Sequence, residues 1–220
     1  MFLEVKNVTK SIHGDVVIKN VSLCSERGRV IGLRGINGSG KTMLMRLISG
    51  LIRPTKGQVL IDGEVVSKDI PFPRSLGVLI EGPAFLDDYS AMDNLKLIAY
   101  PKGKVTEDEI KAVLSEVRLD PKSRKKYKKF SLGMKQRLGI AAAVMEHPDL
   151  ILLDEPTNAL DESSVDMLGD IVKKEKERGA VLIVSSHDRD ILEDISDEIY
   201  DLEQGEIVRH SIKGEKRSEG

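Results

Sequence analysis

A glycine-rich stretch of eight residues constrains this chain more than any other part of its sequence: it reads Gly35-Ile-Asn-Gly-Ser-Gly-Lys41-Thr42. It matches the spacing G-x-x-x-x-G-K-[ST], follows the apolar run Val30 to Leu33 and precedes a helical segment that ends near Gly50. The glycines let the backbone curl so that successive N–H groups converge, and a helix start adds about half a positive charge behind them. The stretch therefore predicts a strand, a phosphate-binding loop and a helix.

The residues of this loop are suited to a nucleoside triphosphate with its metal. Lys41 is placed to reach the β- and γ-phosphates, and the hydroxyl of Thr42 to ligate Mg²⁺. A glycine-rich turn with a chance lysine is the alternative, and the motif's fixed features in their proper context argue against it. The predicted nucleotide-binding residues are Gly35, Ile36, Asn37, Gly38, Ser39, Gly40, Lys41, Thr42 and Met43.

Two more apolar runs are predicted to bring polar groups to the same edge of a sheet. The run 150–153 is followed by Asp154 and Glu155, and the run 181–184 is followed by Ser-Ser and His187. Continuous Val, Ile and Leu are typical of strands covered on both faces, and ligands bind at the carboxyl ends of such strands. We expect Asp154 to hold Mg²⁺ and Glu155 to activate a water as general base. A lone histidine is usually structural, and only this shared edge makes His187 a candidate.

Strands alternate with helices along the whole chain, which indicates an α/β fold. We expect a P-loop NTPase with a mostly parallel central sheet flanked by helices, an antiparallel β subdomain and an inserted helical lobe. Period-two alternation predicts strands at 2–9, 15–23 and 57–61, and helices are expected at about 40–49, 106–119, 131–146, 162–178 and 188–195. The predicted single domain divides into an ATP-binding core with the β subdomain (1–84 and 147–212), a helical subdomain (85–146) and a frayed polar tail (213–220).

Composition excludes several classes of protein. The 220 residues carry 34 Lys and Arg against 36 Asp and Glu, and the longest stretch without formal charge, 179–187, has nine residues. A membrane-spanning helix needs about 20 apolar residues, and the N-terminus lacks the pattern of a signal peptide. Cys24, the single cysteine, suits a reducing compartment and is predicted to be buried in its strand. The basic run 122–129 contains one aromatic residue, so we expect a solvated surface and no nucleic-acid partner.

The segment Phe130-Ser-Leu-Gly-Met-Lys-Gln-Arg137 resembles the signature motif of ATP-binding cassette (ABC) ATPases, commonly Leu-Ser-Gly-Gly-Gln before a basic stretch. The other family motifs follow in order, with a D-loop at Ala159-Leu160-Asp161 and an H-loop histidine at His187. The resemblance implies a head-to-tail dimer, homomeric or heteromeric, with ATP between the P-loop of one copy and the signature of the other. Ser131 and Gly133 then contact the γ-phosphate of the other copy's ATP, Asp161 lies at the same interface, and His187 senses the γ-phosphate.

Departures from the family pattern point to a branch. The family's Q-loop glutamine is replaced by Glu81, which keeps an acceptor oxygen for Mg²⁺ but exchanges an amide donor for negative charge. Met43 replaces a hydroxyl residue that normally assists the α-phosphate, and Ile12-His13 stands where an aromatic ring normally stacks on adenine, which leaves the preference for ATP over GTP open. The motifs around Glu81 and the signature resemble the bacitracin-resistance and lantibiotic-immunity exporters.

The resemblance implies an ATPase that powers transport through separate transmembrane permease subunits, with ATP and Mg²⁺ at its site. Export of a peptide antibiotic or similar amphiphile is the leading expectation, with the chain cytoplasmic and peripheral on the inner face of the membrane. Two alternatives stay open. One is a soluble ABC ATPase acting on ribosomes or DNA, which usually carries a second cassette or a long insertion. The other is a P-loop kinase, which lacks the signature and the D-loop.

Overall fold

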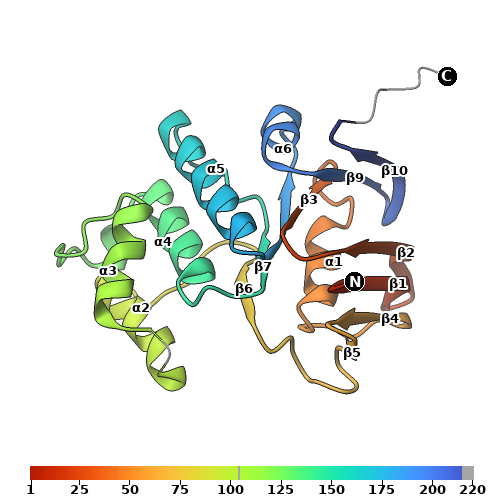
Figure 1. The fold of residues 1–220 in the computed structure, drawn as a ribbon, viewed down its shortest axis with the longest axis horizontal. Helices are drawn as coiled ribbons and strands as arrows, with labels where there is room; N and C mark the ends of the chain where they lie inside the picture. Colours follow the sequence, from red (N-terminus) through yellow and green to blue (C-terminus); the bar gives the residue numbers. More distant parts are fainter. Residues whose placement is uncertain (104, 215–220) are drawn as a thin grey trace.

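The computed structural model describes residues 1–103 and 105–214, and these form two sheets and a set of helices (Figure 1). Within those residues one sheet has six strands in the order β10-β9-β3-β8-β7-β6, and the other has four in the order β2-β1-β4-β5. The strands are β1 (Leu3–Ile12), β2 (Asp15–Ser25), β3 (Arg29–Arg34), β4 (Lys56–Ile61), β5 (Glu64–Val65), β6 (Leu76–Leu79), β7 (Leu150–Leu153), β8 (Val181–Ser186), β9 (Glu198–Glu203) and β10 (Glu206–Ile212).

The three predicted central strands are confirmed and lie next to one another. Strands β3, β8 and β7 pair in parallel, with Leu150 opposite Val181 and Val181 opposite Arg29. Every residue of β7 and β8 is buried. Sequence reasoning did not place β6 and β9 in this sheet, although both pair in parallel with it. Strand β6 is short, contains Gly77 and has an exposed edge residue, Val78, so its pattern is weak.

The smaller sheet is antiparallel and contains the three strands that alternation predicted. One expectation about it is wrong, because Cys24 is exposed. Leu23 and Ser25 on either side face inward, so period-two geometry turns Cys24 outward. Asn20 adopts a positive φ of 48°, where the register with β1 shifts between Ile18 and Val21.

The predicted helices are confirmed with small shifts at their ends, and one more is present. The helices are α1 (Lys41–Ile48), α2 (Ala91–Ala99), α3 (Glu107–Glu116), α4 (Leu132–Val144), α5 (Glu162–Glu177) and α6 (Arg189–Ile195), with short 3-10 helices η1 (Tyr100–Lys102) and η2 (Tyr127–Lys129). Thr106 and Glu109 cap α3 reciprocally as expected. Helix α2, which was not predicted, begins with a similar box of Ser90 and Asp93.

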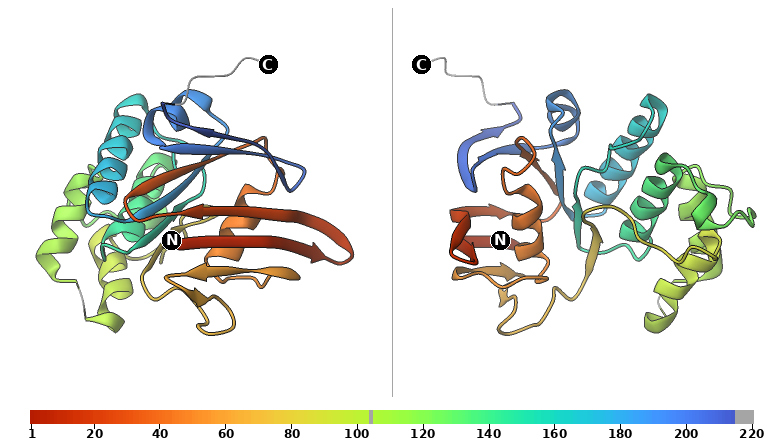
Figure 2. Two further views of the ribbon diagram at one scale, coloured as in Figure 1. Left: turned by 45° about the vertical axis from the view of Figure 1, so that its right-hand side comes forward. Right: turned by 180° about the vertical axis from the view of Figure 1, so that it is seen from behind.

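Alternating side chains of the six-stranded sheet separate two hydrophobic cores. Ile31, Leu152 and Ile183 face α1 and the antiparallel sheet, so α1 lies between the two sheets (Figure 2). Ile151 and Leu182 face the opposite way and pack against α4, α5 and the lobe. Helices therefore cover the sheet on both faces, which confirms the predicted fold class.

The segment 85–146 consists of helices and loops in its described part, and Figure 1 shows it to one side of the sheets. The subdomain limits given above stay a prediction. Lys213, predicted to begin a frayed tail, is instead held by a backbone hydrogen bond to Asp197 (2.7 Å), and residues 215–220 of that tail lie outside the described residues. Among the described residues, no helix is both long enough and apolar enough to span a bilayer.

Candidate functional site

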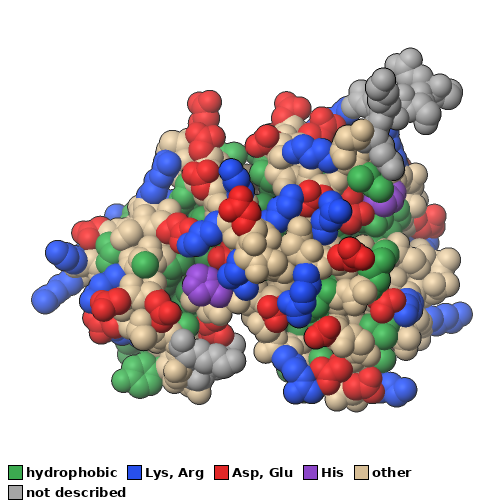
Figure 3. Space-filling view, in the orientation of Figure 1, with side chains coloured by type: hydrophobic (Ala, Val, Ile, Leu, Met, Phe, Trp, Pro, Cys, Tyr) green, Lys and Arg blue, Asp and Glu red, His purple; other side chains and the backbone are tan. Residues whose placement is uncertain are grey.

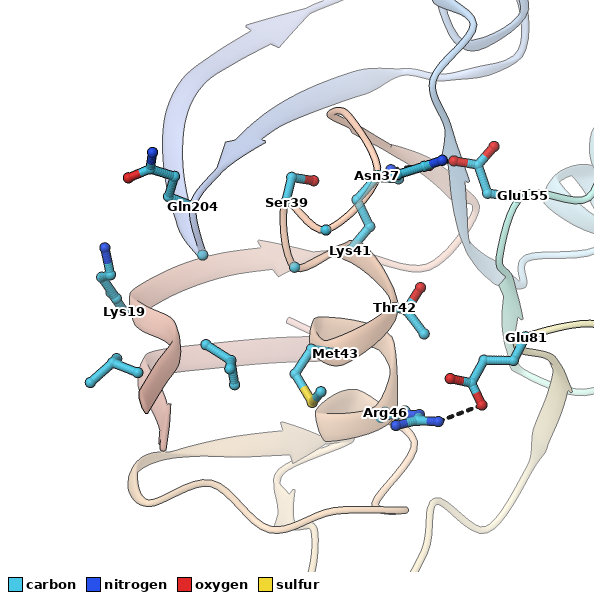
Figure 4. A pocket seen from close by; sticks show the side chains of 15 residues that line it. Lys19, Asn37, Ser39, Lys41, Thr42, Met43, Arg46, Glu81, Glu155 and Gln204 are labelled. Carbon is cyan, nitrogen blue, oxygen red and sulfur yellow. Dashed lines mark ion pairs between the residues drawn. The ribbon is translucent and has the colours of Figure 1, made fainter. Parts of the chain in front are cut away.

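The glycine-rich loop connects β3 to α1 and borders a cavity of about 650 Å³ (Figure 4). Gly40, the residue before α1, has a φ of 111°, which a side chain would strain. A Cβ at Gly35 would come within 2.4 Å of the carbonyl oxygen of Leu202. Neither a capping side chain nor an acidic residue occupies the first turn of α1. Its free N–H groups therefore form an anion site beside the cavity.

Lys41 is almost fully buried at the start of α1 and turns back toward the loop. Its Nζ donates hydrogen bonds to the carbonyl oxygens of Gly35 (2.6 Å) and Ile36 (3.3 Å). The same nitrogen lies 3.3 Å from Oε1 of Glu155. The ammonium group of Lys41 thus lies between the glycine-rich backbone and the acidic residues that follow β7.

Thr42 and Asp154 meet across the space between α1 and β7. The Thr42 hydroxyl donates to Oδ2 of Asp154 (2.7 Å), and the hydroxyl of Ser185 donates to Oδ1 (2.6 Å). Asp154 is buried, so these two bonds hold both of its oxygens in place. Sequence reasoning had no role for Ser185, and its position at the end of β8, two residues before His187, was the available signal.

The structure brings Glu155 and His187 together, as the shared strand edge predicts. Nδ1 of His187 lies 2.9 Å from Oε2 of Glu155, while Oε1 is buried and accepts no hydrogen bond among the described residues. The backbone of Glu155 has a positive φ of 46°. Its N–H donates to the Ser185 hydroxyl (2.8 Å), and its carbonyl accepts from Nε2 of Gln136 (3.2 Å). This carboxylate is therefore aimed at the cavity by contacts from two other elements.

The oxygen donors around Thr42 fit Mg²⁺. This ion prefers hard oxygen ligands, and it commonly takes one or two carboxylates while phosphates and waters complete its shell. A hydroxyl and the carboxylate of Asp154 meet at one point, and Glu81 borders the same cavity. Among the described residues, no group of three or more His, Cys, Asp or Glu side chains is arranged to hold a metal. The oxygen donors of Thr42 and Asp154 fit an ion that arrives with a phosphate ligand.

Glu81 lies just after β6 and is paired with Arg46 of α1 (Figure 4). Its carboxylate is half exposed and its backbone has a positive φ of 64°. Glu81, Thr42 and Glu155 also border a second cavity, of about 750 Å³, whose other side is formed by Leu132 and Gln136 of α4. Glu81 therefore lies between the cavity beside the glycine-rich loop and the helical lobe.

The signature residues do not border the P-loop cavity of their own chain. Ser131 caps α4, with its hydroxyl accepting from the N–H of Met134 (3.2 Å). Gly133 packs under the D-loop, where a Cβ would lie 2.8 Å from the carbonyl oxygen of Ala159. Asp161 caps α5, and hydrogen bonds from Ser164 lower the pKa of its carboxyl.

The end of the P-loop cavity away from the strand edge is formed by β2 and the β9–β10 turn. Val16, Val17, Lys19 and Gln204 border it together with Met43. Of these only Met43 was predicted, because the others lie far from any motif. Ile12 and His13 are not among the residues that border the cavity.

Comparison with known proteins gives a consistent picture. A family model described as ABC transporter matches residues 18–158. An uncharacterized ABC transporter ATP-binding protein of Bacillus subtilis (strain 168), YybJ, is 45% identical over 205 residues, covering 93% of this chain and 94% of that protein. The lantibiotic transport ATP-binding protein SrtF of Streptococcus pyogenes is 36% identical over 207 residues, covering 94% of this chain and 89% of SrtF.

Two further likenesses bear on substrate and assembly. The bacitracin transport ATP-binding protein BcrA of Enterococcus faecalis is 36% identical over 208 residues, covering 94% of this chain and 68% of BcrA. A solved dimeric structure of the ATP-binding cassette MJ0796, described as a post-hydrolysis state bound to ADP and Pi, superposes with a TM-score of 0.86 at 25% identity, covering 97% of this chain and all of that one.

Proposed function

Because this chain belongs to the ABC transporter family, as an ATP-binding subunit and an ATPase, we propose that it powers export of a peptide antibiotic or similar amphiphile through a separate membrane subunit. The observation that carries the catalytic part is the position of the Glu155 carboxylate, between Lys41 and His187 at the mouth of the P-loop. The transport part is supported by the names of SrtF and BcrA.

In the proposed mechanism the glycine-rich backbone and the start of α1 bind the phosphates, and Lys41 turns from the loop carbonyls to the β- and γ-phosphates. This movement ends its 3.3 Å contact with Oε1 of Glu155. That oxygen then accepts a proton from the water that attacks the γ-phosphate. His187, held against the other carboxylate oxygen, keeps the base oriented and places its second ring nitrogen toward the γ-phosphate.

We propose Thr42, Asp154 and Glu81 as the protein ligands of Mg²⁺, directly or through water. The ion, when bound, neutralises charge that develops on the transferred phosphate. Ser185 keeps Asp154 oriented for this role by donating to Oδ1, while Oδ2 is bonded to the Thr42 hydroxyl where both residues border the second cavity.

A second copy of the chain, or a related cassette, completes the proposed site. The start of α4 offers backbone N–H groups to an anion besides that of Met134, which Ser131 caps, and Ser131, Gly133 and Asp161 lie away from their own P-loop cavity. In a head-to-tail dimer they contact the ATP of the other copy. MJ0796 is described as a dimeric cassette bound to ADP and Pi.

The membrane subunit is proposed to dock on the helical lobe. Exposed hydrophobic side chains gather on α2, η1 and the loop before them, and Figure 3 shows hydrophobic atoms at the tip of this lobe. They are Leu86, Tyr89, Leu97, Ile98 and Tyr100. Elsewhere on that face acidic and basic side chains are interspersed, and this distribution argues against a nucleic-acid partner. This docking places the chain at the cytoplasmic face of the membrane.

The proposal is tested in a bacitracin-sensitive bacterium that expresses this chain with the membrane protein encoded beside it. We expect wild type to raise resistance to bacitracin or to a lantibiotic, and Glu155→Gln to abolish the gain.

Leu97→Asp should prevent copurification with the membrane protein yet leave ATP hydrolysis in place, because Leu97 is about half exposed on α2, far along the chain from the P-loop. Val208→Asp, at a similarly exposed position on β10, is the matched control. Copurification with ribosomes, or phosphorylation of an acceptor, would contradict the proposal.

A further inference from the structure

Arg46 has no role in the site as described so far, yet it lies within it. It belongs to α1, four residues after Thr42, so the two side chains lie on one face of the helix. Arg46 borders the P-loop cavity and pairs with the carboxylate of Glu81, which comes from the opposite wall (Figure 4). The ion pair thus connects α1 to the loop after β6, about one helical turn from the hydrogen bond between Thr42 and Asp154.

The conformation of Glu81 indicates that this contact holds it in place. Its φ of 64° is in the left-handed region, which is strained for a residue other than glycine. Strain of this kind persists where surrounding contacts over-determine the backbone, and it clusters at ligand sites. The guanidinium of Arg46 is the cation that contacts this half-exposed carboxylate.

We propose that Arg46 and the metal–nucleotide complex compete for the carboxylate of Glu81, so that Arg46 sets how strongly nucleotide binding depends on Mg²⁺. This inference rests on the proposed metal site of Thr42, Asp154 and Glu81. A carboxylate neutralised by a guanidinium is a weaker metal ligand than a free one, because the two cations repel each other across a shared anion. Arg46 is in this sense a positioning residue.

Release of Glu81 from Arg46 can be transmitted to the helical lobe through the loop that follows Glu81. The loop that follows it is tied to the lobe through Pro83, whose carbonyl accepts a hydrogen bond from the Tyr127 hydroxyl (2.6 Å). Pro83 also packs where a Cβ on Gly139 of α4 would fall. Exchange of one cation for another at Glu81 therefore acts on a loop whose next residues are fixed to η2 and α4 of the helical lobe, the lobe that also carries the surface proposed for docking.

The experiment measures the affinity of the full chain for a fluorescent ADP analogue in Mg²⁺ and in EDTA. The quantity compared between variants is the affinity in Mg²⁺ divided by the affinity in EDTA. Arg46→Met should raise this ratio roughly two- to fivefold, the scale of one partly exposed ion pair. Arg46→Lys, which keeps a cation in reach, should stay near wild type. In a Glu81→Gln background Arg46→Met should no longer change the ratio. Arg74→Met is the matched control, since Arg74 pairs with Glu64 in the antiparallel sheet.

Thermal unfolding of each variant shows that it is folded. An equal change from Arg46→Met in both backgrounds, or no change in either, would overturn the competition. Asp154→Asn separates this outcome from failure of the metal site itself. If Asp154→Asn removes the Mg²⁺ dependence while Arg46→Met is without effect, only the role of Arg46 is wrong. If Asp154→Asn leaves the dependence intact, the proposed metal site is wrong and the inference falls with it.

Discussion

At the scale of single residues, the geometry of the site depends on a serine that belongs to none of the sequence motifs. Ser185 is fully buried at the end of β8 and makes two hydrogen bonds, donating to Asp154 and accepting from the N–H of Glu155. It therefore fixes both the proposed metal ligand and the proposed general base. A buried hydroxyl in this position connects the chemistry of two strands.

We expect Ser185→Ala to destabilise the chain by about 1–3 kcal/mol, because it leaves a buried carboxylate oxygen and a buried N–H without partners. ATP hydrolysis should fall at the same time, since both acidic residues lose a constraint. Urea unfolding and phosphate release measure the two effects. The control is Ser186→Ala, because the equally buried hydroxyl of Ser186 accepts from the N–H of Asp188 and is not bonded to Asp154 or Glu155 among the described residues. Equal loss of hydrolysis in both variants would show that Ser185 has no special relation to the site.

At the scale of elements, the start of α4 and the D-loop are packed too closely to move independently. Gly133 is one residue inside α4, and the carbonyl of Ala159 lies against it. Gln136, one turn further, donates to the carbonyls of Glu155 and Pro156 at 3.2 and 3.0 Å. The signature helix is thereby connected to the end of β7 and its general base.

Gly133→Ala should therefore cost about 1–3 kcal/mol of stability, since a new methyl group meets backbone and forces a shift. It should also slow ATP hydrolysis by displacing the D-loop. Gly169→Ala in α5 is the matched control, because nothing lies within 4 Å of the added carbon and alanine favours the helix by about 1 kcal/mol. Thermal unfolding of both variants is the measurement, and a stabilised Gly133→Ala chain would contradict the packing described here.

At the scale of the whole molecule, one chain separates the two halves of the proposed ATP site. The P-loop cavity is bordered by residues from α1, β2 and the ends of β6 and β7, while Ser131 and Asp161 cap helices outside it. The net charge of −2 puts little long-range repulsion between two copies. Association of two cassettes on ATP is the arrangement that we propose to join the halves.

Glu155→Gln is expected to form a stable dimer in ATP and Mg²⁺, because the nucleotide that joins two copies is then not hydrolysed. Sedimentation should show a doubling of the 24.3 kDa mass with ATP and a monomer with ADP. Adding Ser131→Arg to this variant should prevent dimerisation, since a bulky cation then replaces the cap at the start of α4. A Glu155→Gln chain that stays monomeric at millimolar ATP would contradict a site shared by two copies of this chain.

The sequence by itself determined the elements that carry local patterns. Continuous apolar runs predict β7 and β8, the glycine spacing predicts the loop before α1, and Thr106 with Glu109 predicts the start of α3. Such features depend on backbone geometry and short-range hydrogen bonds, which neighbours in sequence decide. That these strands bring polar groups to one sheet edge could also be predicted, because the carboxyl ends of parallel strands meet there, but their order, β3-β8-β7, could not.

Only the tertiary structure decided how distant groups pair. The contacts of Glu155 with Lys41 and His187, of Ser185 with Asp154, and of Arg46 with Glu81 join residues 30 or more positions apart in a folded sheet, and no periodicity encodes them. Strand β6 and the outward face of Cys24 belong here too, because pairing and register set them. The motifs name the chemistry of the site, and the packing of β6, β7 and β8 beside α1 sets its geometry.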